Sequence, residues 1–166
     1  MSIRTNRDVP SGSSLGAERM TKVQRYRVVL VREHGGESVK LTKPVRTSTD
    51  AAALLRPAFE GLDREQFVVM MLDTKHRPIG LNVVALGSLN AAVVHPREVF
   101  KPAVVASAAS LILGHNHPSG IAEPSAEDIE ITHRLREVGE IIGIRVLDHV
   151  ILGDAEYFSF SDSGRL

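Results

Sequence analysis

The chain has 166 residues, of which 43% are hydrophobic and 24% are charged, values typical of one globular domain with a sizeable core. Twenty basic and twenty acidic residues cancel, so no overall charge draws the chain to nucleic acid or a membrane surface. The lack of cysteine excludes disulfides and thiolate metal sites, and no apolar run approaches the roughly 20 residues that span a bilayer. The N-terminus has no apolar signal core, so we expect a cytoplasmic protein.

The N-terminal half is predicted to start with a flexible polar tail over residues 1–24, and a single domain is expected over residues 25–166. Thr49-Asp50 is expected to open a helix that is rich in alanine and leucine. Turn residues separate the predicted strands, and we expect the strands over 67–72 and 79–86 to form a hairpin. In chain order, the predicted elements are strands over 26–33 and 38–42, a helix over 51–60, and strands over 67–72 and 79–86.

The C-terminal half contains two helical patterns and a closing hairpin. Gly143 is expected to end the second helix, and Gly153-Asp154 to form the turn of the hairpin. The predicted elements are a strand-like stretch over 87–94, a helix over 97–110, a strand from Leu111, a helix over 125–142, and strands over 144–152 and 157–160. This mixture predicts an α/β fold in which a mixed β-sheet packs between helices.

The chemistry is concentrated in residues 111–128, which have the sequence LILGHNHPSGIAEPSAED. If the apolar start is a strand, His115 and His117 leave the same face at its C-terminal end. Ser125 is a good N-cap, which places Asp128 in the first turn of a helix. Two imidazoles and one carboxylate leave a fourth tetrahedral position open, as in catalytic zinc sites. The alternative is a histidine-rich loop beside an ordinary capped helix.

The spacing His-x-His, seven residues, Ser, two residues, Asp resembles the metalloprotease signature of the JAB/MPN family, also called JAMM. The sequence His-Asn-His-Pro-Ser-Gly, followed by Pro-Ser-Ala-Glu-Asp, is similar to that of its RadC branch, and the resemblance covers about residues 42–160. It implies a JAB/MPN domain with a fold similar to that of the cytidine deaminases. It also implies a zinc-dependent metallohydrolase, a peptidase or isopeptidase, whose substrate is a protein or peptide.

The resemblance implies a role for each motif residue. His115, His117 and Asp128 match the zinc ligands, and zinc lowers the pKa of its water from about 16 to about 7. Ser125 matches the serine that stabilises the oxyanion, although helix capping competes for the same hydroxyl. The family's general base is a glutamate near the start of a buried strand, and Glu65 fits this position best. The alternative for Glu65 is a solvated side chain in a loop.

Three further polar residues lie near the motif or its elements. His149, on an apolar strand, is expected to be a hydrogen-bonded core histidine, with orientation of a metal ligand as the second interpretation. His95 is expected to cap the helix that follows it, a position that the adjoining proline favours. Asn116 should point to the strand face opposite to the two histidines and tie down a loop.

Two other functions follow from similar observations. A non-catalytic accessory module in DNA repair or replication, the role historically attached to RadC-like proteins, would keep the metal site as a remnant. Salt-dependent DNA binding would support it, whereas the neutral charge and a tail too short for the helix-hairpin-helix region of longer RadC proteins weigh against it. A nucleobase deaminase needs His-x-Glu and Pro-Cys-x-x-Cys, which a chain without cysteine cannot supply.

Overall fold

A computed structural model describes residues 27, 29, 43–87 and 94–166. Its elements in chain order are α1 (Ser48–Leu55), the 3-10 helix η1 (Arg56–Phe59), β1 (Gln66–Leu72), β2 (Pro78–Leu86), α2 (Pro96–Val105), β3 (Ser110–Asn116), α3 (Ala126–Ile142), β4 (Arg145–Leu152) and β5 (Tyr157–Ser159). The predicted tail and the predicted strand over 38–42 lie outside the described residues. Of the predicted strand over 26–33 only residues 27 and 29 are described, and most of the strand-like stretch over 87–94 is outside as well. No helix in the described part of the chain is long and apolar enough to cross a membrane.

The strands form one sheet in the order β2-β1-β3-β4-β5. The predicted hairpins pair β1 with β2 and β4 with β5 antiparallel, whereas β3 and β4 run parallel because α3 connects them. Antiparallel pairing of β1 with β3 places Phe67 beside His115. The sheet is therefore mixed, which confirms the predicted α/β class.

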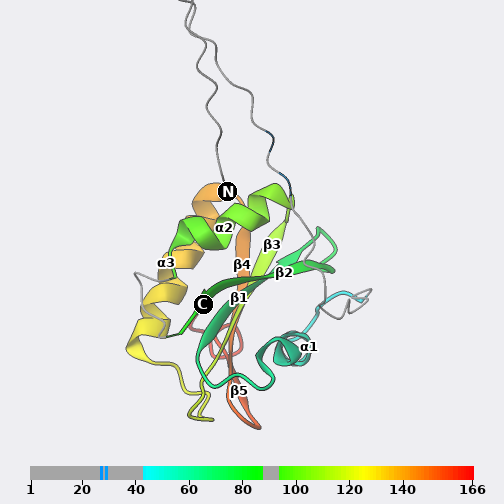
Figure 1. Ribbon diagram of the computed structural model, residues 1–166. Coiled ribbons are helices and arrows are strands. Elements are labelled where there is room, and N and C mark those ends of the chain that lie inside the picture. Colours follow the sequence, from blue (N-terminus) through cyan, green and yellow to red (C-terminus); the bar gives the residue numbers. More distant parts are fainter. Residues whose placement is uncertain (1–26, 28, 30–42, 88–93) are drawn as a thin grey trace, which may run out of the picture.

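Helices cover both faces of the sheet, with α2 and α3 on one side and α1 on the other (Figure 1). The face toward α2 and α3 carries Phe67, Val69 and Leu113, which pack with Phe100 and Leu135 of the helices. Alternate residues point to the opposite face, and both β1 and β3 are buried along their whole length. His115 belongs to the first of these faces, two residues after Leu113.

The helix predicted over 51–60 begins earlier and ends earlier than expected. Thr47, and not Thr49, is the N-cap, and it forms a capping box with Asp50. The α-helix stops at Leu55 because Pro57 leads into the 3-10 turn η1. Leu55 then packs on the sheet at Gly114, where a Cβ atom would come within 2.8 Å of Leu55 Cδ1.

The helix predicted over 97–110 was also too long, because α2 ends at Val105. Ser107 adopts a positive φ of 54°, and Ser110 already pairs with β1 and β4. His95 caps this helix as predicted, its Nδ1 accepting from the Arg97 N–H. The helix α3 matches its prediction, since Ser125 caps its start and Gly143 ends it in the left-handed conformation with φ 78°.

Candidate metal centre

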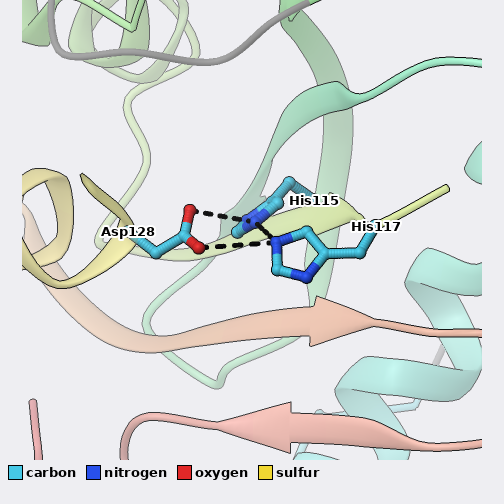
Figure 2. Close-up of side chains that lie close together, drawn as sticks. All are labelled: His115, His117 and Asp128. Atoms are coloured by element: carbon cyan, nitrogen blue, oxygen red, sulfur yellow. Dashed lines mark hydrogen bonds and ion pairs between the residues drawn. The ribbon is translucent and has the colours of Figure 1, made fainter. Parts of the chain in front are cut away.

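Three side chains converge where the C-terminal end of β3 meets the N-terminus of α3 (Figure 2). His115 Nε2 lies 3.0 Å from His117 Nε2 and 3.1 Å from Asp128 Oδ1. His117 Nε2 lies 3.4 Å from Asp128 Oδ2. This group could hold a metal ion, because each residue offers one ligand atom within 4.8 Å of the others. The alternative of an unconnected histidine-rich loop does not describe this arrangement.

The separations fit a small tetrahedral cation. Ligand bonds of about 2.0–2.1 Å place pairs of ligand atoms about 3.3 Å apart in a tetrahedral site. The two Nε2 atoms are 3.0 Å apart, and each lies 3.1 or 3.4 Å from a different oxygen of the Asp128 carboxylate. The second nitrogen of His117, Nδ1, lies 2.7 Å from the carbonyl oxygen of Ile121, which can only accept a hydrogen bond. In the neutral ring the proton is therefore on Nδ1, and the lone pair of Nε2 faces the other ligand atoms.

The start of α3 fixes the carboxylate of Asp128. The side chain accepts from the Ser125 N–H at 2.8 Å and from the Ser125 hydroxyl at 2.7 Å, both on Oδ2. The Ser125 Oγ in turn accepts from the Asp128 N–H at 3.1 Å, which completes a capping box. Oδ1 remains directed at His115. The predicted cap and the predicted ligand are therefore parts of one local structure.

The pKa values of Asp128 and His117 depend on the charged and polar groups around them. Burial alone would raise the pKa of Asp128, but hydrogen bonds from His115 and His117 together with the charge of His115 hold it well below its ordinary value. The hydrogen bond to Asp128 raises the pKa of His117, and the charge of Glu65 adds to this rise against the opposing effect of burial. The carboxylate is thus ionised and favours a positive charge beside it, whether proton or metal.

Glu65 immediately precedes β1 and is half-buried. It lies two residues before Phe67, whose ring stacks on that of His115 at 6.0 Å, so strand alternation puts Glu65 on the face of the ligand set. Asn116 binds both neighbours of Glu65, since Oδ1 accepts from the Gln66 N–H at 2.8 Å and Nδ2 donates to the Arg64 carbonyl at 3.0 Å. The expectation that Asn116 ties down a loop is confirmed.

His149 lies directly behind His115. It is fully buried, and its Nε2 is 2.9 Å from His115 Nδ1, so it contacts a predicted ligand as well as being a hydrogen-bonded core residue. Burial lowers its pKa well below the ordinary value, so the ring is neutral near pH 7. Thr132, which the sequence analysis did not single out, contacts His149 Nδ1 at 2.6 Å. The i, i+4 spacing from Asp128 was the available signal for it.

A cleft of about 390 Å³ adjoins His117. It is bounded by η1 and the turn after it, by the end of β3, and by the turn between β4 and β5. Arg56 closes one wall because its Nη1 donates to the carbonyls of Gly153 at 3.1 Å and Asp154 at 2.9 Å. The lining residues are Arg56, Phe59, Glu60, Gly61, Leu62, Asn116, His117, Pro118, Leu152, Gly153 and Asp154.

Comparison with known proteins agrees with this geometry. Residues 45–165 match the family described as "RadC-like JAB domain". A protein named UPF0758 protein from Rubrobacter xylanophilus is 54% identical over 125 residues, which are 75% of this chain and 55% of the relative. UPF0758 proteins from Halalkalibacterium halodurans and Methanococcoides burtonii are 51% and 50% identical, each over 74% of this chain and 53% of the relative. The chain therefore spans about half the length of these curated relatives.

Proposed function

The chain belongs to the RadC-like JAB domain family, and from this membership and the ligand geometry we propose that it is a zinc-dependent metallohydrolase, a peptidase or an isopeptidase. The observation that carries the proposal is the convergence of His115 Nε2, His117 Nε2 and the Asp128 carboxylate at 3.0–3.4 Å. Three protein ligands of this type leave one tetrahedral position for water or substrate, which is typical of catalytic zinc.

His115, His117 and Asp128 would hold the zinc ion. When bound, zinc would supply Lewis-acid chemistry, making water more acidic and polarising a carbonyl oxygen. The ionised Asp128 offsets part of the positive charge, and its hydrogen bonds from Ser125 hold it in the ligand orientation. Phe67, stacked on His115, excludes water from the inner side of the group and so strengthens its electrostatic interactions.

We assign the general base to Glu65. Its carboxylate would accept a proton from the attacking water and deliver it to the amide nitrogen as the C–N bond breaks. The charge of Glu65 adds, after larger effects, to the raised pKa of His117, which supports a carboxylate on the side of the proposed site. The clamp of Asn116 on Arg64 and Gln66 supports it too, since it fixes the backbone on both sides of Glu65.

We further propose that Ser125 stabilises the oxyanion that forms on the substrate carbonyl. The hydroxyl proton of Ser125 is donated to Asp128 Oδ2 at 2.7 Å. Donation to the substrate requires the hydroxyl to rotate away from Oδ2, while the Ser125 N–H continues to hold that oxygen. Replacing Ser125 with alanine should therefore reduce hydrolysis more than it reduces zinc affinity.

Of the three proposed ligands only His117 lines the cleft, so a peptide bound there would reach the site past His117. Phe59, Leu62 and Leu152 provide apolar surface within the cleft. Arg56 holds one wall of the cleft in place by donating hydrogen bonds to carbonyl oxygens of the β4–β5 turn.

The test combines metal analysis with a hydrolysis screen. Purified parent protein should contain near-stoichiometric zinc, and Asp128→Asn and the double variant His115→Ala/His117→Ala should lose it. Glu65→Gln should keep the zinc but lower the rate on peptide and isopeptide substrates by roughly 10²–10⁴-fold. A parent that is free of metal and does not take up added zinc would overturn the proposal and favour a non-catalytic binding module.

A further inference from the structure

A buried chain of hydrogen bonds joins His115 to the backbone of Asp128 through two residues that are not ligands. His115 Nδ1 lies 2.9 Å from His149 Nε2, and His149 Nδ1 lies 2.6 Å from Thr132 Oγ1. The Thr132 hydroxyl donates to the Asp128 carbonyl oxygen at 2.6 Å. His115, His149 and Thr132 are each at most 1% exposed, so no solvent water takes part. These hydrogen bonds connect β3 through β4 to α3.

The chemistry of the last bond sets the direction of every other bond. A carbonyl oxygen only accepts, so the single hydroxyl proton of Thr132 is committed to Asp128. Thr132 Oγ1 must then accept from His149, which puts the proton of His149 on Nδ1. A neutral His149 with that tautomer offers Nε2 as an acceptor, so His115 donates from Nδ1. His115 Nε2, which faces His117 and the Asp128 carboxylate, can then give up its proton to make room for a metal ion without breaking any bond of this series.

We propose that Thr132 and His149 are positioning residues that hold His115 in the tautomer able to bind a metal through Nε2. The proposal rests on the metal site of the proposed function and extends it to residues beyond the ligands. The same contacts couple two ligands from different elements, because the bonds start on His115 in β3 and end on Asp128 in α3. The tautomer of His117 is set separately, by the Ile121 carbonyl.

Ring packing keeps His149 in the orientation that the chain of bonds needs. Its imidazole is stacked on Phe160 at 5.1 Å with an interplanar angle of 10°, and it contacts Phe67 at 5.4 Å. The ring is therefore fixed, and what remains free is the position of its single proton. Without an acceptor at Nδ1, the proton of His149 is as well placed on Nε2, facing His115. His115 would then carry its own proton on Nε2, inside the ligand set.

The hydroxyl of Thr132 is therefore the group that decides where His149 and His115 carry their protons. A matched pair of variants at this position tests its role. Thr132→Val keeps the shape of the side chain but removes the hydroxyl, whereas Thr132→Ser keeps the hydroxyl. The first readout is the tautomer of His115 and His149 in the metal-free protein, from long-range proton–nitrogen NMR spectra. The second is zinc affinity, measured by competition with a chelating dye, with thermal unfolding as a check on folding.

In the parent and in Thr132→Ser, we expect His149 to carry its proton on Nδ1 and His115 to carry a proton on Nδ1, whether or not a second proton on His115 Nε2 faces Asp128. In Thr132→Val, His115 should lose its proton on Nδ1, and zinc affinity should fall roughly 10–100-fold, as for other groups that orient metal ligands. Equal zinc affinity in the valine and serine variants would overturn the proposal. So would a parent in which His115 has no proton on Nδ1, a result that needs no variant to fold.

The outcome is separable from that of the proposed function. A parent with the expected tautomers but no zinc affinity would remove the metallohydrolase and, with it, the metal-binding purpose of the hydrogen-bond chain. A parent that binds zinc and keeps its affinity in Thr132→Val would leave the metallohydrolase standing and remove the role of Thr132 and His149. His149→Phe, which keeps an aromatic ring without nitrogen, should match Thr132→Val in lowering zinc affinity.

Discussion

Asp128 and Asp50 occupy the same position in two capping boxes, and replacing each with asparagine separates metal binding from helix capping. Asp50 accepts from the backbone N–H groups of Arg46 and Thr47 at the exposed start of α1. Asp128 accepts from the Ser125 N–H at the start of α3 as Asp50 does from Thr47, and it also accepts from the Ser125 hydroxyl and faces His115 and His117. Asp50→Asn is therefore a control for the capping part of the effect of Asp128→Asn.

Loss of the charged capping acceptor should lower the stability of both variants without metal, and more so in Asp128→Asn, which also loses its interactions with His115 and His117. Zinc at about 1,000 times its dissociation constant stabilises the native state by about 4 kcal/mol. For a domain of this size, that corresponds to a rise in the midpoint of thermal unfolding of about 8–16 °C. The parent and Asp50→Asn should show the full rise, and Asp128→Asn should show almost none because it lacks a ligand.

Thermal unfolding followed by circular dichroism, with zinc and with excess chelator, measures both quantities on the same samples. A full zinc-dependent rise in Asp128→Asn would refute the assignment of Asp128 as a ligand. An equal loss of the rise in Asp50→Asn would refute the reasoning in a different way, because it would show that general helix stability, and not the ligand, controls the response to zinc.

Three further predictions test other parts of the molecule. Because the hydrogen bond to Asp128 raises the pKa of His117 above 6.5, its proton stabilises the metal-free fold below that value and is lost as pH rises through the raised pKa. Zinc affinity from dye competition should therefore increase with pH across this window and level off above it; a flat profile would contradict the His117 assignment. Asn116→Ser should lower the free energy of unfolding in denaturant by roughly 1–3 kcal/mol, through the lost buried hydrogen bonds, and leave zinc affinity unchanged; a large loss of affinity would show that Asn116 acts on the ligands. Gly114→Ala should cost about 1–3 kcal/mol because its Cβ would meet Leu55 Cδ1 at 2.8 Å. Leu55→Ala should make that cost smaller in the double variant, and additive losses would contradict the contact.

The ligand set was predictable because its members are close in the sequence and each depends on local structure. His115 and His117 need only strand alternation, and Asp128 needs only the cap that Ser125 begins. The structure brings these three together as expected. The resemblance to the JAB/MPN family pointed to the same residues, and the family match confirms that the chain has a RadC-like JAB domain.

The interactions behind the ligands were not predictable in the same way, because they depend on pairing between distant strands. His149 reaches His115 only through the parallel register of β3 with β4, in which Leu113 pairs with His149 after a shift between Leu111 and Ile112. No periodicity in either strand reveals that register. The sequence therefore left two interpretations for His149. The structure confirms the hydrogen-bonded core residue, and because its partner is the candidate ligand His115, orientation of that ligand stays a proposal.

The end of α2 differed from prediction because tertiary pairing overrode local preference. The alanine- and serine-rich residues after Val105 are compatible with a helix, but Ser110 pairs with Leu72 of β1 and Arg145 of β4. The chain must therefore leave the helix early enough to enter the sheet, and Ser107 adopts its positive φ at this point. The helix α2 therefore ends because the chain has to enter the sheet, and not because of a helix-breaking residue.

Helix capping and the proposed metal binding share the carboxylate of Asp128 at the start of α3, which explains how a short motif can build the site. Asp128 Oδ2 accepts from Ser125, as an N-terminal capping carboxylate does, and this leaves Oδ1 directed at His115. The positive end of the helix dipole favours the ionised carboxylate at this position. Thr132, one turn later, bonds the Asp128 carbonyl and extends the same helix toward His149. In the proposed site, a single turn of α3 would thus orient Asp128 directly and His115 through His149, so that side chains from β3, β4 and α3 together would determine its geometry.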